Sequence, residues 1–526
     1  MHCEHIFSIR ISGKCARYTV DMWRYSLPLL SGILLALVFW PLYAWPLALI
    51  GLAPLFYFIA RPELSRGQVF FGGFIAGALA VAPTLYTSLF QLVMQPGAAV
   101  LTYSVRASSV FFFVFIGALF GGMALAYRAL RGRGALLDSL CAASLYTVVE
   151  LILFTVFGGY YYASLAHALV PFPPALIIAS LGGVPLLVFA AAWINAVVAQ
   201  RSWCLALGAF IFLSIICGGA FWYGQSHATA GLPLSVALIQ RSPQSLLYTT
   251  APAPKPFGDY GLQKIILSAS GGGSASLVVY PFSPVEATYI GVRPAVETLD
   301  NIEPDSVVGE WLKSFVPAST TVVLWNTAAE HGNLYDEIEF WNNGLKQTYQ
   351  KHLLHALSDY TPRWLQRFGL ARIPYSLMPG AANSVSIDGI HIGNLACSET
   401  QQETYARRQA AGSGLLLSVG FDSFFPGSLA PYWSLQAARL RAAENGTPLI
   451  RSSIFGPSAL IAADGTIQTE FGFDETGVLH GSITIEKIPT LYAYAGSLPV
   501  YLFIAALLLY LLVLRINNNS DARRRG

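Results

Sequence analysis

The chain has 526 residues, of which 54% are hydrophobic and only 11% are charged, a balance that soluble proteins do not show. Part of the chain is therefore expected to lie in a membrane. The net charge of +3 combines basic flanking segments with an acidic block, residues 227–487, which holds 22 acidic and 16 basic side chains. The basic residues form no stripe, which argues against nucleic-acid binding.

The first part of the chain predicts membrane helices. Residues 1–24 are polar and basic and are expected to form a cytoplasmic tail. Residues 25–60 carry no charge, and about 54 Å of helix is too long for one crossing of a hydrocarbon core of about 30 Å. Because Pro41 and Pro46 would break such a helix, we predict two helices, 27–43 and 46–60. Further spans are expected at 67–92, 108–129, 136–157, 174–199 and 203–223.

These seven spans define a transmembrane domain over residues 25–225. An eighth span at 498–514 is expected within a C-terminal segment, residues 491–526, that ends in a basic cytoplasmic tail. Basic residues of the short connections fall almost entirely on one side, at Arg61, Arg66, Arg128, Arg131, Arg133, Arg201, Arg515 and Arg523 to Arg525, against Arg106 on the other. The positive-inside rule then places residues 226–490 outside the cytoplasm, in the periplasm of a Gram-negative cell. No cleaved signal peptide is expected.

The block 226–490 alternates apolar strands and helices. Strands are predicted at 235–240, 275–280, 320–325, 335–341, 390–396, 415–419, 449–453, 458–463, 466–471 and 478–485. Helices are predicted at 261–270, 305–315, 400–411 and 431–444. Repeated βα units that end in antiparallel hairpins, one of them turned by Ala463-Asp464-Gly465, indicate a layered α/β sandwich.

Cys397 is the only cysteine of this block. It ends a predicted strand and precedes a helix, where the local field lowers the pKa of a thiol. The alternative is a small buried hydrophobic residue. The other five cysteines lie before or inside the apolar spans, so no disulfide partner is expected. The nine histidines show no metal-ligand spacing, since His352 and His355 lack a third partner, and no metal or cofactor is expected.

Several motifs together resemble the apolipoprotein N-acyltransferase family, a membrane-embedded branch of the nitrilase superfamily. They are YPFSP (280–284), YQKHLL (349–354), LACSE (395–399), ARLRAAENGTPLIRSS (438–453) and ASLGG (179–183). The resemblance spans nearly the whole chain. It implies eight transmembrane helices joined to a nitrilase-like carbon-nitrogen hydrolase domain, a four-layer αββα sandwich at residues 226–490.

The nitrilase superfamily uses a Glu, Lys, Cys triad, in which a thiolate attacks a carbonyl, a carboxylate moves protons and an ammonium stabilises the oxyanion. By motif, the resemblance makes Cys397 the nucleophile and Lys351 the oxyanion stabiliser. Glu399 matches the family's Cys-x-Glu motif as a supporting carboxylate. Asp359 stands where the family has a second supporting glutamate.

The family's catalytic glutamate is missing from its motif position. It should follow the aromatic residue and proline that are here Tyr280 and Pro281, but Phe282 stands there. A phenyl ring cannot accept a proton, and loss of a general base typically costs about 10² to 10⁴ in rate. Glu286 is a candidate substitute base. In the fifth span Glu150 is retained, either as a hydrogen-bonded structural carboxyl or as a lipid-binding group.

Three functional hypotheses follow. In the first, a monomeric inner-membrane enzyme takes an acyl chain from a phospholipid donor as a Cys397 thioester and passes it to the N-terminal amine of a diacylglyceryl-cysteine lipoprotein acceptor. In the second, an impaired paralogue binds lipoproteins or assists envelope assembly, as Phe282 suggests. In the third, the thiol and lysine support only slow self-acylation. The retained Lys351, Cys397 and Glu399 favour the first.

Overall fold

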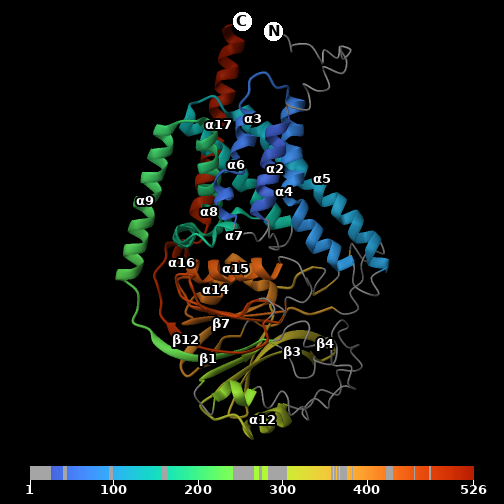
Figure 1. Ribbon diagram of the computed structural model, residues 1–526, viewed down its shortest axis with the longest axis vertical. Helices are drawn as coiled ribbons and strands as arrows, with labels where there is room; N and C mark the ends of the chain where they lie inside the picture. Colours follow the sequence, from blue (N-terminus) through green and yellow to red (C-terminus); the bar gives the residue numbers. More distant parts are fainter. Residues whose placement is uncertain are drawn as a thin grey trace, which may run out of the picture.

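The computed structural model describes two parts of the chain, a bundle of apolar helices and a pair of β-sheets. In Figure 1 the bundle occupies one end of the molecule and the sheets the other, with α14 (Glu403–Ala410) and α15 (Ala430–Asn445) between them. The described residues are 25–39, 44–93, 99–156, 164–240, 266–271, 275–281, 305–356, 359–360, 363, 367, 376–381, 383–421, 430–454, 456–472 and 475–525.

The bundle contains long and short apolar helices. They are α2 (Ser26–Val38), the 3₁₀ helix η1 (Trp45–Leu49), α3 (Ala53–Ile59), α4 (Arg66–Val93), α5 (Ala99–Leu130), α6 (Ala135–Val156), α7 (Leu165–Leu169), α8 (Pro173–Gln200), α9 (Trp203–Ser226), α16 (Leu491–Ala495) and α17 (Leu498–Arg525). Within the described residues, five helical stretches are long and apolar enough to cross a membrane, namely 112–130, 135–156, 173–200, 203–226 and 498–518. The apolar segments 26–38, 45–59 and 66–82 are shorter.

The predicted helix 46–60 is interrupted in the structure. The 3₁₀ helix η1 starts at Trp45, and α3 begins anew at Ala53 with a proline in its first turn. The fully buried side chain of Asn195 in α8 provides hydrogen-bond partners for the backbone groups at this break. Its Oδ1 accepts from the amides of Leu52 (2.7 Å) and Ala53 (3.2 Å), and its Nδ2 donates to the carbonyl of Ala48 (2.8 Å). A buried amide therefore supplies the acceptors that the start of a membrane helix needs.

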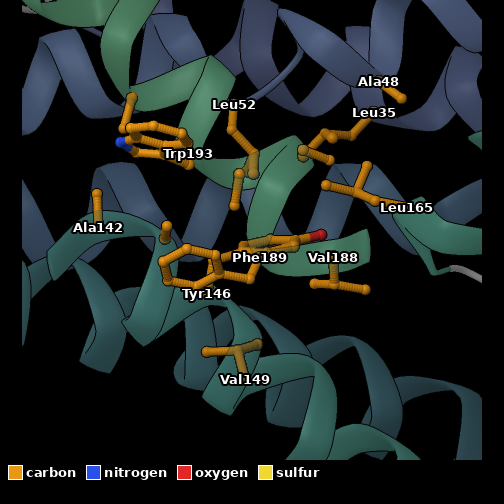
Figure 2. Close-up of a cluster of buried hydrophobic side chains, with 14 of the residues drawn as sticks. Leu35, Ala48, Leu52, Ala142, Tyr146, Val149, Leu165, Val188, Phe189 and Trp193 are labelled. Atoms are coloured by element: carbon orange, nitrogen blue, oxygen red, sulfur yellow. The ribbon is translucent and has the colours of Figure 1, made fainter. Parts of the chain in front are cut away.

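An apolar core holds the bundle together. Figure 2 shows Tyr146 and Val149 of α6 packed with Val188, Phe189 and Trp193 of α8, and all five side chains are less than a tenth exposed. Burial of a large apolar side chain contributes roughly 1.5 to 3 kcal/mol in water, but between lipid-facing helices the close fit of side chains provides the attraction. The fit between α6 and α8 positions the end of the bundle that contacts α15.

The two sheets repeat one pattern. The first has the order β12-β1-β2-β3-β4-β5 and the second β11-β10-β9-β8-β7-β6. In each, three neighbouring strands pair in parallel, β1-β2-β3 in the first sheet and β9-β8-β7 in the second, and every other neighbouring pair is antiparallel. The bounds are β1 (Leu232–Gln240), β2 (Leu277–Tyr280), β3 (Thr321–Glu330), β4 (Asn333–Asn342), β5 (Leu345–Gln350), β6 (Val385–Ile387), β7 (Ile390–Ala396), β8 (Leu415–Phe421), β9 (Leu449–Ile454), β10 (Ala459–Ile461), β11 (Ile467–Glu470) and β12 (Gly477–Ile485). The predicted strands are found, but β5 and β6 were not predicted.

Helices cover the outer faces of both sheets. Residues such as Leu238, Val279 and Ile450 fill the space between the sheets. On the outer face of the first sheet, α12 (Asp305–Lys313) contributes Leu312 to a second buried cluster, and α14 and α15 pack on the outer face of the second sheet. Figure 1 shows α12 at the far end of the molecule and α15 against the bundle.

The helix α15 contacts the bundle at a kink in α8. Gly182 and Gly183 leave helical geometry, with φ +73° at Gly183, and the amide of Val184 loses its helical acceptor. That amide donates to Oε1 of Glu444 (3.0 Å), which is fully buried and forms an ion pair with Arg441 at 3.0 Å. The ASLGG segment and the Arg-Ala-x-Glu segment, 260 residues apart, thus meet at one hydrogen bond.

This contact predicts a dependence of stability on pH. Burial raises the pKa of Glu444 from 4.5 to about 8, since it outweighs the Arg441 ion pair, and Glu403 raises it further. The folded state then binds the proton more tightly than the unfolded state, so stability falls as pH rises through this range. We expect the apparent melting temperature of the purified protein to fall between about pH 5 and about pH 8. Glu444→Gln, which keeps an oxygen for Val184, should flatten the profile, and an unchanged profile in this variant would contradict the assignment.

Gly446, which follows α15 directly, is expected to be unusually sensitive to substitution. Gly446 has φ +53°, and a Cβ there would lie 1.7 Å from the carbonyl oxygen of Ile488. Gly412 has φ +78° with open space around it. We expect Gly412→Ala to cost only the left-handed strain, about 1 to 2 kcal/mol, while Gly446→Ala must also displace backbone. Thermal unfolding should show the larger loss for Gly446→Ala, and equal losses would refute this explanation.

Candidate functional site

Cys397 lies at a sharp turn between a strand and a helix. It follows β7 directly and is the first residue of the 3₁₀ helix η5 (Cys397–Gln401). Its φ is +51°, a left-handed conformation that costs a side-chain-bearing residue about 1 to 2 kcal/mol. The side chain is partly buried against the core between the sheets. The turn holds the thiol at the end of a central parallel strand.

Lys351 extends from the end of β5 and is 1% exposed. Its Nζ donates to Oδ2 of Asp359 at 2.5 Å, and the same oxygen accepts from the amide of His355 at 2.7 Å. Burial by itself lowers the pKa of Lys351, but the attraction of Asp359, followed by Cys397 and Asp336, outweighs burial and raises it. Lys351 is therefore a buried ammonium that lies close enough to Cys397 to interact electrostatically with a thiolate there.

Glu399 joins the segment of Lys351 to the strand of Cys397. Its Oε1 accepts from the amides of His352 (2.8 Å) and Leu353 (2.9 Å). Its Oε2 accepts from the hydroxyl of Tyr349 (2.6 Å) and the amide of Ala396 (2.8 Å). Burial raises the pKa of Glu399, and these hydrogen bonds oppose the rise. With four donors on its two oxygens, this carboxylate connects the residues on either side of Lys351 and Cys397.

Two residues near this centre were not singled out from the sequence. Tyr349 donates to Glu399, and Asp336 of β4 is 1% exposed. The register pairs Glu337 with Gln350, so Asp336 lies across from Lys351, whose amide donates to the Asp336 carbonyl at 2.8 Å. Oδ1 of Asp336 accepts from Thr327 at 3.1 Å. An acidic residue at a core-facing position, in alternation with buried apolar residues of the same strand, was the available signal.

The position of the missing glutamate lies outside the described residues. Phe282 and Glu286 both fall in the undescribed stretch 282–304, and β2 ends just before it, at Tyr280. Because β2 and β3 run parallel and β5 runs parallel to them through two antiparallel steps, their carboxyl ends share one edge of the sheet. The chain after Tyr280 therefore leaves the sheet on the same edge as Lys351.

Glu150 forms structural hydrogen bonds in the bundle. Its Oε2 accepts from the hydroxyl of Ser164 at 2.6 Å, and its Oε1 accepts from the amide of Leu165 at 3.1 Å. The carboxyl thus caps the start of α7. The hydrogen-bonded structural role, one of the two alternatives for this residue, is present in the structure.

The arrangement is suited to nucleophilic acyl transfer. A thiol beside a buried ammonium can form a thiolate, and the ammonium can stabilise the oxyanion of a tetrahedral intermediate. Among the described residues, no group of three His, Cys, Asp or Glu side chains is placed to hold a metal ion.

Comparison with known protein families matches both parts of the chain. Residues 31–197 match the family model described as the apolipoprotein N-acyltransferase N-terminal domain, and residues 318–492 match the carbon-nitrogen hydrolase model. The chain is 27% identical to the apolipoprotein N-acyltransferase of Azotobacter vinelandii over 488 residues, which covers 87% of this chain and 89% of the relative. It is 27% identical to that of Pseudomonas syringae pv. tomato over 505 residues, covering 92% and 95%.

Two solved structures have a distant similarity to this chain. A carbon-nitrogen hydrolase superfamily protein from Xanthomonas campestris, solved with an arsenic adduct in its active site, is 19% identical with a TM-score of 0.36, covering 48% of this chain and 91% of that protein. A branch 10 member of the nitrilase superfamily from Saccharomyces cerevisiae is 16% identical with a TM-score of 0.35, covering 51% and 94%.

Proposed function

Because this chain is a divergent member of the apolipoprotein N-acyltransferase family, we propose that it transfers a fatty acyl chain to the N-terminal amine of a diacylglyceryl-cysteine lipoprotein, with a membrane phospholipid as donor. The observation that carries the proposal is the buried ammonium of Lys351, held by Asp359 and linked through Glu399 to the strand of Cys397. Family membership supplies the substrates, and this geometry supplies a means of catalysis.

In the proposed first step, the thiolate of Cys397 attacks the ester carbonyl of the phospholipid. The ammonium of Lys351 stabilises the oxyanion, and Asp359 keeps that ammonium in place. The C–O bond then breaks, lysophospholipid leaves with a proton, and a thioester remains on Cys397. In the second step the lipoprotein amine attacks the thioester, the C–S bond breaks, and the amide product leaves with the thiol restored. A carboxylate must carry the protons, and Glu286 is our candidate in place of the residue that Phe282 replaces.

The architecture that we propose has eight membrane crossings and four domains. They are a cytoplasmic tail (1–24), a seven-helix domain (25–225), a carbon-nitrogen hydrolase domain (226–490), and a final helix with a basic tail (491–526). The packing of helices on the outer faces of both sheets supports a four-layer αββα sandwich. The one-sided arginines support an inner-membrane protein whose hydrolase domain lies in the periplasm. We propose that it acts as a monomer.

Reconstitution tests the proposal directly. The full chain is placed in vesicles of phospholipid that carries a labelled acyl chain, together with a diacylglyceryl-cysteine peptide. We expect the label to appear on the peptide amine as a hydroxylamine-resistant amide. A peptide with an acetylated amine is the matched control and should stay unlabelled. If the free-amine peptide acquires no label, transfer is refuted.

A second candidate is a lipoprotein-binding role without turnover, which Phe282 favours. Because binding needs no chemistry, this role predicts that the protein retains the diacylglyceryl-cysteine peptide in the absence of any acyl donor and never labels it. Peptide retention without a thioester would select this candidate over the enzyme.

A further inference from the structure

A pocket of about 500 Å³, which includes its open mouth, lies where the bundle meets α14 and α15. Its lining combines apolar side chains of the membrane helices with polar side chains of the hydrolase part. Leu151 and Phe154 of α6 and Tyr501 of α17 line one side, and Gln401 and Arg441 line the other. We call Leu151, Phe154 and Tyr501 the apolar half of the pocket, and Gln401, Glu403 and Arg441, at and beside η5, its polar half. Polar residues of the bundle also line the pocket, namely Thr147, Glu150, Ser164 and His167.

The polar half contains donors without acceptors. Nε and Nη1 of Arg441 and Nε2 of Gln401 have no hydrogen-bond partner among the described residues. Arg441 is 1% exposed and Gln401 5% exposed. Leaving a buried donor unpaired costs about 1 to 3 kcal/mol, more for a charged group. Three such atoms on the wall of one pocket indicate a bound acceptor.

The charges around the pocket allow that acceptor to be an anion. The oxygens of Glu150 already accept from Ser164 and Leu165. Glu403 and Glu444 both act on Arg441, and burial raises the pKa of each carboxyl. Burial thus shifts both carboxyls toward their neutral form, which weakens their repulsion of an anion. Nη2 of Arg441 keeps its ion pair with Glu444, while Nε and Nη1 have no acceptor among the described residues.

The apolar half leads toward the bilayer. Leu151 is 36% exposed on the surface of α6, and α17 beside it exposes a series of large apolar residues such as Leu502. A ligand that fills both halves must carry an anionic head and an apolar chain.

We propose that this pocket binds the phosphate group of a membrane phospholipid, with Arg441 and Gln401 donating hydrogen bonds to it and an acyl chain passing between α6 and α17 into the bilayer. Such a lipid lies against the end of η5 and couples the membrane to the helix that carries Cys397. The inference adds a lipid site to the proposed function and does not depend on turnover at Cys397.

Photocrosslinking tests the site. The full chain with Cys397→Ser, which prevents turnover of the probe, is reconstituted with a phospholipid that carries a diazirine on its acyl chain, and crosslinks are located by mass spectrometry. We expect crosslinks in the 147–154 segment of α6 and near Tyr501. Leu151→Trp should abolish them by filling the pocket. Ile152→Trp is the matched control, because Ile152 is also 36% exposed but does not line the pocket.

Equal crosslinking in the two tryptophan variants would mean unspecific lipid contact or a pocket that holds only water, and would overturn the proposal. Displacement of the probe by inorganic phosphate would assign the site to a free anion and overturn the lipid assignment. Gln401→Leu removes one unpaired donor and leaves the ion pair of Arg441 and Glu444 intact. It should reduce crosslinking without lowering the melting temperature of the lipid-free protein. Undiminished crosslinking in this variant would exclude the phosphate contact.

Discussion

Cys397→Ser will abolish the acyl group that the purified protein acquires when it is incubated with phospholipid. In the parent chain we expect a thioester, detected as an added acyl mass that hydroxylamine removes. A serine hydroxyl in the same turn lacks the thiolate, and removal of a catalytic nucleophile typically lowers the rate by about 10⁴-fold or more. At that rate the adduct stays below detection, and transfer to a lipoprotein peptide stops with it.

The matched control is Cys204→Ser. Cys204 is an exposed thiol near the start of α9, and its removal should leave the adduct unchanged. An adduct that survives Cys397→Ser but disappears with Cys204→Ser would refute the nucleophile assignment. An unlabelled parent chain would instead select the binding role, in which Cys397 has no chemical task.

The position of Cys397 could be predicted because its pattern is local. Alternating apolar residues indicate β7, and a short polar run after it indicates a turn into a helix. Lys351, Asp359 and Glu399 were identified by motif alone, and only the structure shows that Lys351 and Asp359 form an ion pair. Asp336 was missed because its importance depends on the register of β4 against β5, and β5 is too polar to read as a strand from its sequence.

The contact between the two halves of the molecule could not be predicted either. Gly182, Gly183 and Pro185 are residues that can kink α8, but the sequence does not show that the kink frees the amide of Val184 or which group accepts from it. From the sequence, Glu444 would be expected to be a solvent-exposed charged residue near the end of a helix. The contact appears only when a distant carboxyl meets the kink, because long-range pairing is not encoded in periodicity. For the same reason the pocket beside Arg441 was not anticipated.

Lys351→Met should abolish acyl transfer and also destabilise the protein. The substitution leaves Asp359 buried, 3% exposed, without its ammonium. Removal of one partner from a buried ion pair typically costs about 3 to 5 kcal/mol, because an uncompensated charge remains. We therefore expect a clearly lower apparent melting temperature together with loss of the hydroxylamine-sensitive adduct.

A double variant separates the two effects. Asp359→Asn removes the negative charge but keeps an oxygen that can accept from the amide of His355. Combined with Lys351→Met, it should recover much of the lost melting temperature, because no charge is then buried unpaired, while acyl transfer stays absent. The reason is that stability needs only the balance of charge, whereas stabilisation of the oxyanion needs the ammonium itself. Recovery of transfer in the double variant would show that Lys351 serves the fold alone, and the proposed mechanism would fail.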